Sequence, residues 1–216
     1  MSKKCYFCGA EAVSKEHVPP KCLFPTKKRK NLIVVPSCDI HNMQKSDDDE
    51  YFKFILSINF NNNISDKEEL SKSVIRAAIF SPKLYKNFAK FSQPIILKTP
   101  SSKILQIATP LDVDIERYHR ILKSITHGIY FHIFNKQLEG TIEIIFDQNI
   151  YLDDSNINMN IYKQTNILHG CFSQIGYKGN NQDVFKYSYY KDKDFIYLEY
   201  IFYEGIQFIV SIKENG

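Results

Sequence analysis

The sequence predicts an α+β protein with a small metal-stapled module at its N-terminus, a helical connector, and a C-terminal region that combines a long helix with an antiparallel β-meander. Three observations lead to this prediction. Four of the five cysteines lie in the first 38 residues, apolar residues recur at helical spacing over 112–135, and short β-rich runs separated by polar turns fill 141–213. We therefore expect two domains, a small module at residues 1–50 and an α+β accessory domain at residues 51–216.

The composition is that of a globular chain, and we expect the protein to be cytoplasmic. Hydrophobic residues make up 44% and charged residues 24% of the sequence, and no apolar run is long enough to cross a bilayer. The N-terminus has no apolar segment of the kind that signal peptides carry. Because cytoplasmic proteins rarely contain disulfides, the clustered cysteines indicate metal binding.

The positive charge is concentrated in the N-terminal quarter. The whole chain has a formal net charge of +4, but residues 1–46 contain nine Lys or Arg against three Asp or Glu, which gives +6 and leaves −2 for the rest. The part of the chain that attracts a polyanion is therefore predicted to be the N-terminal module.

Helical signals follow this module. Residues 46–50, Ser-Asp-Asp-Asp-Glu, are typical of a capped and acidic first turn, so a helix of about three turns is predicted to begin at Ser46. A second helical pattern runs from Ser65 toward Phe91, with Pro82 as a turn or kink, so the helical connector spans about 51–91. Residues 93–110 indicate a loop with one or two short strands.

The C-terminal part is predicted to contain one long helix followed by strands. After an Asp-rich start, the apolar residues of 112–135 recur at helical spacing, which predicts a helix over this range. Polar turns separate the last four of the β-rich runs that follow, as in an antiparallel meander. The five runs are Thr141–Phe146, Asn166–Tyr177, Val184–Tyr190, Phe195–Tyr203 and Ile206–Ile212.

Two pairs of metal-binding residues stand in the N-terminal module. Cys5 and Cys8 form a C-x-x-C pair, followed by a glycine that permits a tight turn. Thirty residues after Cys8, Cys38 and His41 form a C-x-x-H pair. Together the pairs supply the four ligands that a tetrahedral structural zinc needs. Cys22 has no partner at a two-residue gap, so we interpret it as a small apolar side chain rather than a ligand.

Motifs between and after these pairs resemble the HNH endonuclease superfamily. They are Glu16-His17-Val18-Pro19, then Asn31-Leu32, and then Cys38-x-x-His41-Asn42-x-x-Lys45. The family motif runs Asp/Glu-His, Asn-Leu and C-x-x-C-Asn-x-x-Lys inside a zinc-stapled ββα finger. The resemblance covers about the first quarter of the chain, and it implies an HNH-like ββα-metal nuclease finger over residues 1–50.

The resemblance assigns catalytic roles to several residues. His17 would be the general base that activates water, and Asn31 would brace the loop between the two strands and so orient the histidine. Asn42 would bind the catalytic divalent ion, and Glu16 would bind it at the position where the family commonly has Asp. His41 stands where the family commonly has cysteine; we interpret it as a structural zinc ligand, the alternative being a ligand of the catalytic ion.

Phosphodiester hydrolysis explains why such residues belong together. The reaction needs a base that deprotonates water and a hard cation that spreads charge at the phosphate. An imidazole with a pKa of about 6.5 is a base near neutral pH, and amide and carboxylate oxygens suit Mg²⁺, with Mn²⁺ or Ni²⁺ as substitutes. A zinc ion with three thiolates and one imidazole has no open position and is expected to be structural.

Basic residues near the motifs are the candidate nucleic-acid contacts. For these residues we favour phosphate contact over simple solvation. Lys45 would either contact a phosphate or stand at the helix end. The four others would lie on the loop between the two strands of the finger: Lys27, Lys28, Arg29 and Lys30.

Histidines outside the finger have no comparable motif. His119, His127 and His132 lie on the predicted long helix, but their spacing does not place all three on one face, so no second metal site is predicted there. His169 and Cys171 are interpreted as structural, and the tyrosines of the C-terminal strands as packing residues.

The sequence therefore predicts a metal-dependent HNH endonuclease that hydrolyses DNA and carries structural Zn²⁺ and catalytic Mg²⁺. The alternative is a non-catalytic zinc-finger module that binds nucleic acid or protein. A third hypothesis follows from the habits of the family alone: residues 51–216 bind a partner protein, and the chain is the nuclease component of a bacterial defence system against viruses. No membrane association is expected.

Overall fold

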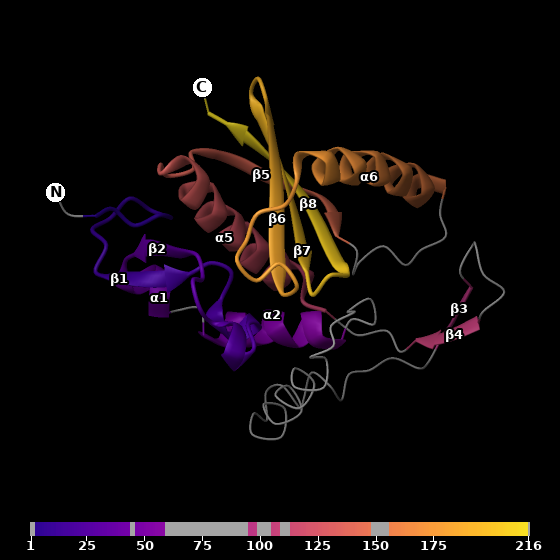
Figure 1. The fold of residues 1–216 in the computed structure, drawn as a ribbon, viewed down its shortest axis with the longest axis horizontal. Helices are drawn as coiled ribbons and strands as arrows, with labels where there is room; N and C mark the ends of the chain where they lie inside the picture. The colour runs from indigo at the N-terminus through magenta and orange to yellow at the C-terminus, as the bar shows by residue number, and fades with distance from the viewer. Residues whose placement is uncertain are drawn as a thin grey trace.

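The N-terminal region has a ββα-like layout. The computed structural model describes residues 3–43, 46–58, 95–98, 105–108, 113–147 and 156–215. Strands β1 (Ser14–His17) and β2 (Val34–Ser37) pair antiparallel, and two 3-10 turns, η1 (Lys21–Leu23) and η2 (Thr26–Lys28), lie between them. Helix α1 (Asp39–Met43) follows β2 directly, so the two strands and the helix form one compact unit (Figure 1).

Helix α2 (Ser46–Ile58) confirms the helix predicted to begin at Ser46. Its first turn is acidic, and the negative side chains there interact favourably with the positive end of the helix dipole. Strands β3 (Ile95–Lys98) and β4 (Leu105–Ala108) pair antiparallel and confirm the short strands predicted within 93–110. The helical pattern predicted from Ser65 to Phe91 lies outside the described residues.

Helix α5 (Ile115–Phe134) confirms the long helix predicted over 112–135. The side chain of Asp114 accepts a hydrogen bond from the backbone N–H of Arg117 at 2.9 Å, which satisfies a donor of the first turn. At the other end, Asn135 has a left-handed backbone with φ of 52° and ends the helix. Neither α5 nor another helix of the described ranges has both the length and the apolar character needed to cross a membrane.

Four strands form the large antiparallel sheet: β5 (Gly140–Asp147), β6 (Phe185–Asp192), β7 (Phe195–Phe202) and β8 (Ile206–Glu214). The strand order is β5-β8-β7-β6. The last three strands form the predicted meander, whereas β5 pairs with β8 and so lies at an edge. Four of the predicted strand regions are thereby confirmed.

The strand predicted over Asn166–Tyr177 is wrong, because most of this stretch belongs to helix α6 (Asn156–Ile175). Its burial follows helical spacing: Thr165 and Phe172 are buried, and Ile167 between them is exposed. β-branched residues and a glycine lower the helix propensity of the stretch. Packing of one helical face on the sheet outweighs that local preference.

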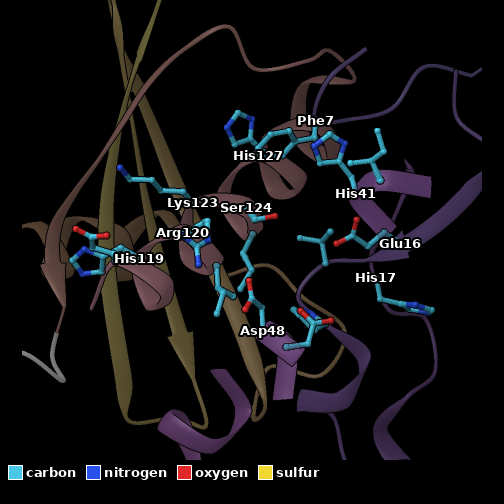
Figure 2. A pocket seen from close by; sticks show the side chains of 17 residues that line it. Phe7, Glu16, His17, His41, Asp48, His119, Arg120, Lys123, Ser124 and His127 are labelled. Carbon is cyan, nitrogen blue, oxygen red and sulfur yellow. The ribbon is translucent and has the colours of Figure 1, made fainter. Parts of the chain in front are cut away.

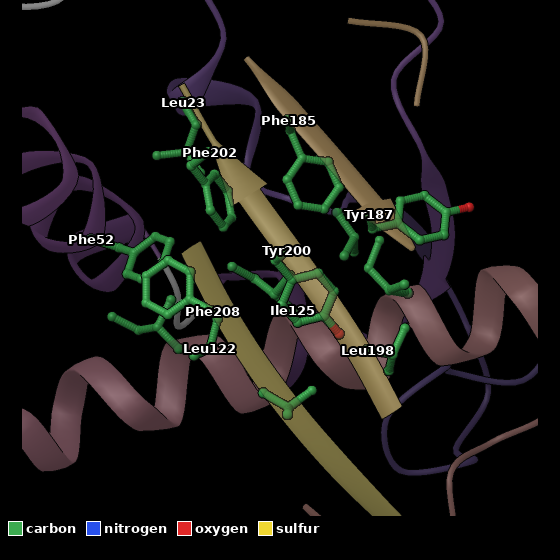
Figure 3. Close-up of a cluster of buried hydrophobic side chains, with 14 of the residues drawn as sticks. Leu23, Phe52, Leu122, Ile125, Phe185, Tyr187, Leu198, Tyr200, Phe202 and Phe208 are labelled. Carbon is green, nitrogen blue, oxygen red and sulfur yellow. The ribbon is translucent and has the colours of Figure 1, made fainter. Parts of the chain in front are cut away.

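The large sheet carries a helix on each face, α5 on one and α6 on the other (Figure 1). Alternate side chains of β8 point to opposite faces, so Phe208 joins the core on the α5 side and Ile209 packs with Phe172 of α6. Leu122 of α5 lies beside Phe208 in this core (Figure 3). The aromatic side chains of β6 and β7 complete it, as expected for half-buried strands.

The same buried cluster continues into the N-terminal region, where Val18 and Leu23 are buried. The hydroxyl of Tyr203 donates to the backbone carbonyl of Leu23 at 2.8 Å, and the side-chain amide of Gln137 donates to the carbonyl of Phe7 at 2.8 Å. The predicted division into domains at residue 50 stays a prediction. Buried contacts nevertheless anchor the N-terminal region on α5 and on the end of β7.

A glycine on α5 permits this docking, which gives a testable prediction. A Cβ atom at Gly128 would lie 2.5 Å from Val18 Cγ2 and 2.7 Å from Val18 Cγ1, inside van der Waals contact. We expect Gly128→Ala to lower the free energy of unfolding in urea by about 1–3 kcal/mol, although alanine favours a helix by roughly 1 kcal/mol. Val18→Ala removes both clashing methyl groups, so the double variant should lose less than the sum; strict additivity would refute the explanation.

Candidate metal centre and the adjoining pocket

Four side chains that could hold a metal ion such as zinc meet beside β2 and α1. Their ligand atoms all lie within 4.8 Å of one another and belong to Cys5, Cys8, Cys38 and His41. Cys8 Sγ is 3.8 Å from Cys38 Sγ. His41 Nδ1 is 3.7 Å from Cys5 Sγ and 3.2 Å from Cys38 Sγ. The structure thus brings together the two pairs that were singled out by their spacing.

The first pair lies in a tight turn. The backbone N–H of Cys5 donates to the carbonyl of Ala10 at 2.7 Å, and that of Gly9 donates to the carbonyl of Cys5 at 3.0 Å. Gly9 has a φ of 73°, which glycine adopts at no steric cost. A Cβ atom there would also lie 2.6 Å from Oε1 of Gln137. The glycine after the C-x-x-C pair therefore serves both the turn and the contact with the residues after α5.

The donor set fits a tetrahedral zinc ion. Zn–S bonds of about 2.3 Å place two sulfurs about 3.8 Å apart and a sulfur and an imidazole nitrogen about 3.6 Å apart. The separations of 3.2, 3.7 and 3.8 Å are close to these values. Burial opposes ionisation of Cys5, but hydrogen bonds from backbone N–H groups, that of Cys8 foremost, outweigh it and lower the pKa of this thiol. A lowered thiol pKa favours the thiolate that binds metal.

Cys22 lies outside this cluster. Its thiol donates to the backbone carbonyl of Asp49 at a distance of 3.6 Å. Burial raises the pKa of this thiol to about 12, so it stays protonated. It packs against the hydrophobic core as a small side chain.

An aromatic stack links the metal centre to α5. Phe7 stacks on the ring of His41, with ring centroids 4.5 Å apart and an interplanar angle of 29°. It also lies against His127 of α5, with centroids 4.3 Å apart. Groups that contact a ligating histidine fix its ring orientation, so the orientation of His41 depends on packing between the N-terminal region and α5.

Glu16 and His17 are consecutive on β1 and therefore point to opposite faces of the strand. Oε2 of Glu16 accepts a hydrogen bond from Ser37 Oγ at 3.3 Å. Figure 2 shows the carboxylate of Glu16 directed into the pocket, on the side of His41, and the imidazole of His17 turned away from it. Burial, together with nearby Lys21, lowers the pKa of His17, and Glu16 acts in the opposite direction.

A pocket of about 730 Å³ opens beside the metal centre (Figure 2). Its N-terminal side includes Glu16, His17 and His41, and α5 forms the opposite side. Sequence reasoning assigned none of the α5 residues to a site; their helical spacing places them along one face but does not show what that face packs against. They include Glu116, His119, Arg120, Lys123 and His127.

Asn42 and Asn31 lie on either side of β2. Asn42 is exposed on α1, and its Nδ2 donates to Ser14 Oγ at 3.0 Å. Because Ser14 and Glu16 share a face of β1, this contact brings Asn42 to the Glu16 side of the strand. Asn31 is exposed, has a left-handed φ of 56°, and accepts a hydrogen bond from Asn180 at its carbonyl, 2.7 Å away. Neither asparagine is among the side chains that line the pocket.

The basic loop that precedes β2 contacts the segment that leads into β6. Lys28 forms an ion pair with Asp183, and Nδ2 of Asn181 donates to the carbonyl of Lys30 at 3.3 Å. Lys45 lies outside the described residues. Apart from Lys28, which is half-buried, the basic residues of the loop are exposed: Lys27, Arg29 and Lys30.

Comparisons of the chain with protein-family models, with curated proteins and with solved structures found no match. Within the residues that the structure describes, the Cys3His cluster is the only group of three or more His, Cys, Asp or Glu side chains whose ligand atoms converge. A second ion in this region would therefore need donors of other kinds, such as amide oxygens, water or phosphate. The chemistry of the site itself has to indicate the function.

Proposed function

We propose that this chain is a metal-dependent endonuclease of the HNH type that hydrolyses phosphodiester bonds of DNA. The position of Glu16 and His17 carries the proposal. Both residues lie on the first strand of a ββα-like unit beside a Cys3His cluster, and both belong to the lining of the adjoining pocket, with the Glu16 carboxylate directed into it and the His17 imidazole turned outward. In the HNH superfamily, which this region resembles, the matching positions hold an acidic residue and the general base.

His17 is assigned the role of general base. Its lowered pKa keeps the imidazole neutral near pH 7, so that it can accept a proton from an attacking water molecule. The burial and the neighbouring Lys21 that lower this pKa also make the protonated ring a stronger acid. The ring therefore returns its proton readily to solvent after each turnover.

Glu16 and Asn42 are the proposed ligands of a catalytic divalent ion such as Mg²⁺, because carboxylate and amide oxygens are the donors that this ion prefers. Nδ2 of Asn42 donates to Ser14 Oγ, so Oδ1 is directed away from Ser14 and can act as a ligand. The ion would supply positive charge to the phosphate and to the leaving oxygen. His41 is assigned to the structural zinc. Asn31 is assigned the role of bracing the loop, and its left-handed φ is one that asparagine tolerates well.

A plasmid-nicking assay tests the proposal. The zinc-loaded wild type is expected to cut supercoiled DNA when Mg²⁺, Mn²⁺ or Ni²⁺ is added, and to leave it intact without a divalent ion. A parallel reaction with RNA decides between the two nucleic acids. Binding of nucleic acid without cleavage under any of these ions would refute the enzyme and support the non-catalytic zinc-finger module instead.

The basic loop gives a prediction about affinity. Asp183 pairs with Lys28, so Asp183→Asn removes a carboxylate that offsets positive charge on the loop. We expect tighter DNA binding, and a slope of log K against log salt that is steeper by about one, measured by fluorescence anisotropy without divalent ions. Asp192→Asn makes the same charge change at the exposed end of β6 and should leave the slope as it is. Equal slopes in the two variants would argue against phosphate contact by this loop.

A further inference from the structure

The pocket wall that faces Glu16 carries two cations and one acid, Glu116, and so has a net positive charge. Arg120 and Lys123 are exposed on α5, and both line the pocket. They are three residues apart and so share a face of the helix, and His127 follows on the same face one turn later. In Figure 2 the α5 residues lie across the pocket from Glu16 and His17.

The side of the pocket away from α5 is acidic. Glu16 of β1 and Asp48 and Asp49 of α2 line it. Asp48 pairs with Arg117, whose Nε is 2.6 Å from Asp48 Oδ1. Carboxylates attract a divalent cation and repel a phosphate, whereas the cations of α5 do the reverse. Three of the lining acids therefore lie on the side of β1 and α2, and the two lining cations lie on α5 together with one acid, Glu116.

Positive charge also continues beyond β1. Lys21 is exposed and close enough to His17 to act on it electrostatically. Cations are thus present on the β1 side, where Lys21 lies near His17, and on the α5 side, where Arg120 and Lys123 line the pocket. A ligand with a single phosphate would use one of these sides. A strand with a phosphate on every nucleotide would use both, while a divalent ion offsets the acids at the centre.

The size of the pocket agrees with this ligand. A volume of about 730 Å³ lies within the range of roughly 300–1,000 Å³ in which proteins enclose drug-sized groups. A pocket of this size holds a short segment of a nucleic-acid strand, and the rest of the strand continues along the protein surface on either side. Arg120 suits the backbone of a strand, since a guanidinium group makes paired hydrogen bonds to phosphate oxygens.

We infer that α5 forms the second half of the substrate-binding surface, and that Arg120 and Lys123 contact backbone phosphates of a nucleic-acid strand next to the phosphate that is cut. The inference rests on the proposed endonuclease function and extends it. It gives the C-terminal part of the chain a direct role in substrate binding. The substrate strand then passes between the N-terminal region and α5.

Two matched double variants test this role. Arg120→Gln with Lys123→Gln removes both charges at exposed positions and keeps polar side chains there. Lys193→Gln with Lys213→Gln removes the same charge from exposed residues at the β6–β7 turn and on β8. Binding of a labelled duplex and a labelled single strand is measured by fluorescence anisotropy over a salt series without divalent ions. Zinc content and thermal unfolding establish that each variant is folded.

The α5 variant is expected to bind at least about tenfold more weakly at low salt. Its slope of log K against log salt should be smaller than the wild-type slope by about two, because two phosphates are no longer neutralised by the protein. The control variant should keep the wild-type slope, and kcat/KM for cleavage should fall only in the α5 variant. If the double variant loses zinc, the single variants Arg120→Gln and Lys123→Gln give the same test, each with a slope smaller by about one.

The outcomes distinguish this inference from the proposed function. A wild type that cuts DNA, with an α5 variant of equal slope and equal kcat/KM, would overturn the role of α5 and leave the endonuclease standing. A wild type that binds but never cuts, with a smaller slope in the α5 variant, would support the role of α5 and overturn the enzyme. A wild type that neither binds nor cuts nucleic acid would overturn both.

Discussion

Replacement of Cys38 by serine is expected to remove the bound zinc and to unfold the N-terminal region. A hydroxyl does not replace a thiolate as a zinc ligand, and three remaining donors leave the ion open to water. Structural zinc contributes roughly 10–16 kcal/mol of apparent binding free energy to the folding of small fingers, as much as the whole net stability of about 5–15 kcal/mol of a typical domain. Metal analysis by mass spectrometry and calorimetry would measure the loss of zinc and the fall in Tm.

The loss should extend beyond the metal centre, because the N-terminal region shares its core with α5. The hydroxyl of Tyr6 lies 3.4 Å from Ser124 Oγ on α5, and Val18 belongs to the same buried cluster. Unfolding of this region would expose the face of α5 that it covers. Cys171→Ser is the matched control, since this thiol is exposed on α6 and should leave zinc content and Tm unchanged. Full zinc occupancy and a wild-type Tm in Cys38→Ser would show that the ligand assignment is wrong.

Local patterns explain why the metal centre could be predicted. The residues of each pair are separated by two positions, and a single turn of backbone brings such a pair to one ion whatever the rest of the chain does. The same reasoning applies to α5, because helical periodicity over 20 residues is a property of one segment. It also applies to β6, β7 and β8, whose short turns dictate that neighbours in sequence pair in space.

Interactions between distant segments explain what sequence reasoning missed. The residues of α6 are helical because one face packs on the sheet, and this packing cannot be predicted from their own composition. Arg120 and Lys123 belong to the pocket only because α5 packs against the N-terminal region. That packing depends on the close approach of Gly128 to Val18 and on the contact of Phe7 with α5, and periodicity within one segment carries no information about either.

Replacement of His17 by alanine is expected to lower the rate of DNA cleavage by about 10²–10⁴-fold, the usual contribution of a general base. Zinc content and Tm should stay near those of the wild type, because the side chain is only partly buried and is not part of the Cys3His cluster. Plasmid nicking with each divalent ion measures the rate. His132→Ala, at an exposed position of α5, is the matched control and should cut normally. Wild-type cleavage by the His17 variant would exclude this residue as the base.

The pH dependence of cleavage separates a base from a residue that only shapes the pocket. The neutral imidazole is the active form, and burial together with Lys21 holds the pKa of His17 below its usual value of about 6.5. The rate should therefore fall on acidification only below a pH of about 6.5, and rise to a plateau above it. Lys21→Gln removes a charge that disfavours the imidazolium, so the acidic limb of the kcat profile should move to higher pH. If the acidic limb of the profile does not move in Lys21→Gln and is still present in His17→Ala, a group other than His17 titrates. The general base would then be one of the pocket histidines of α5.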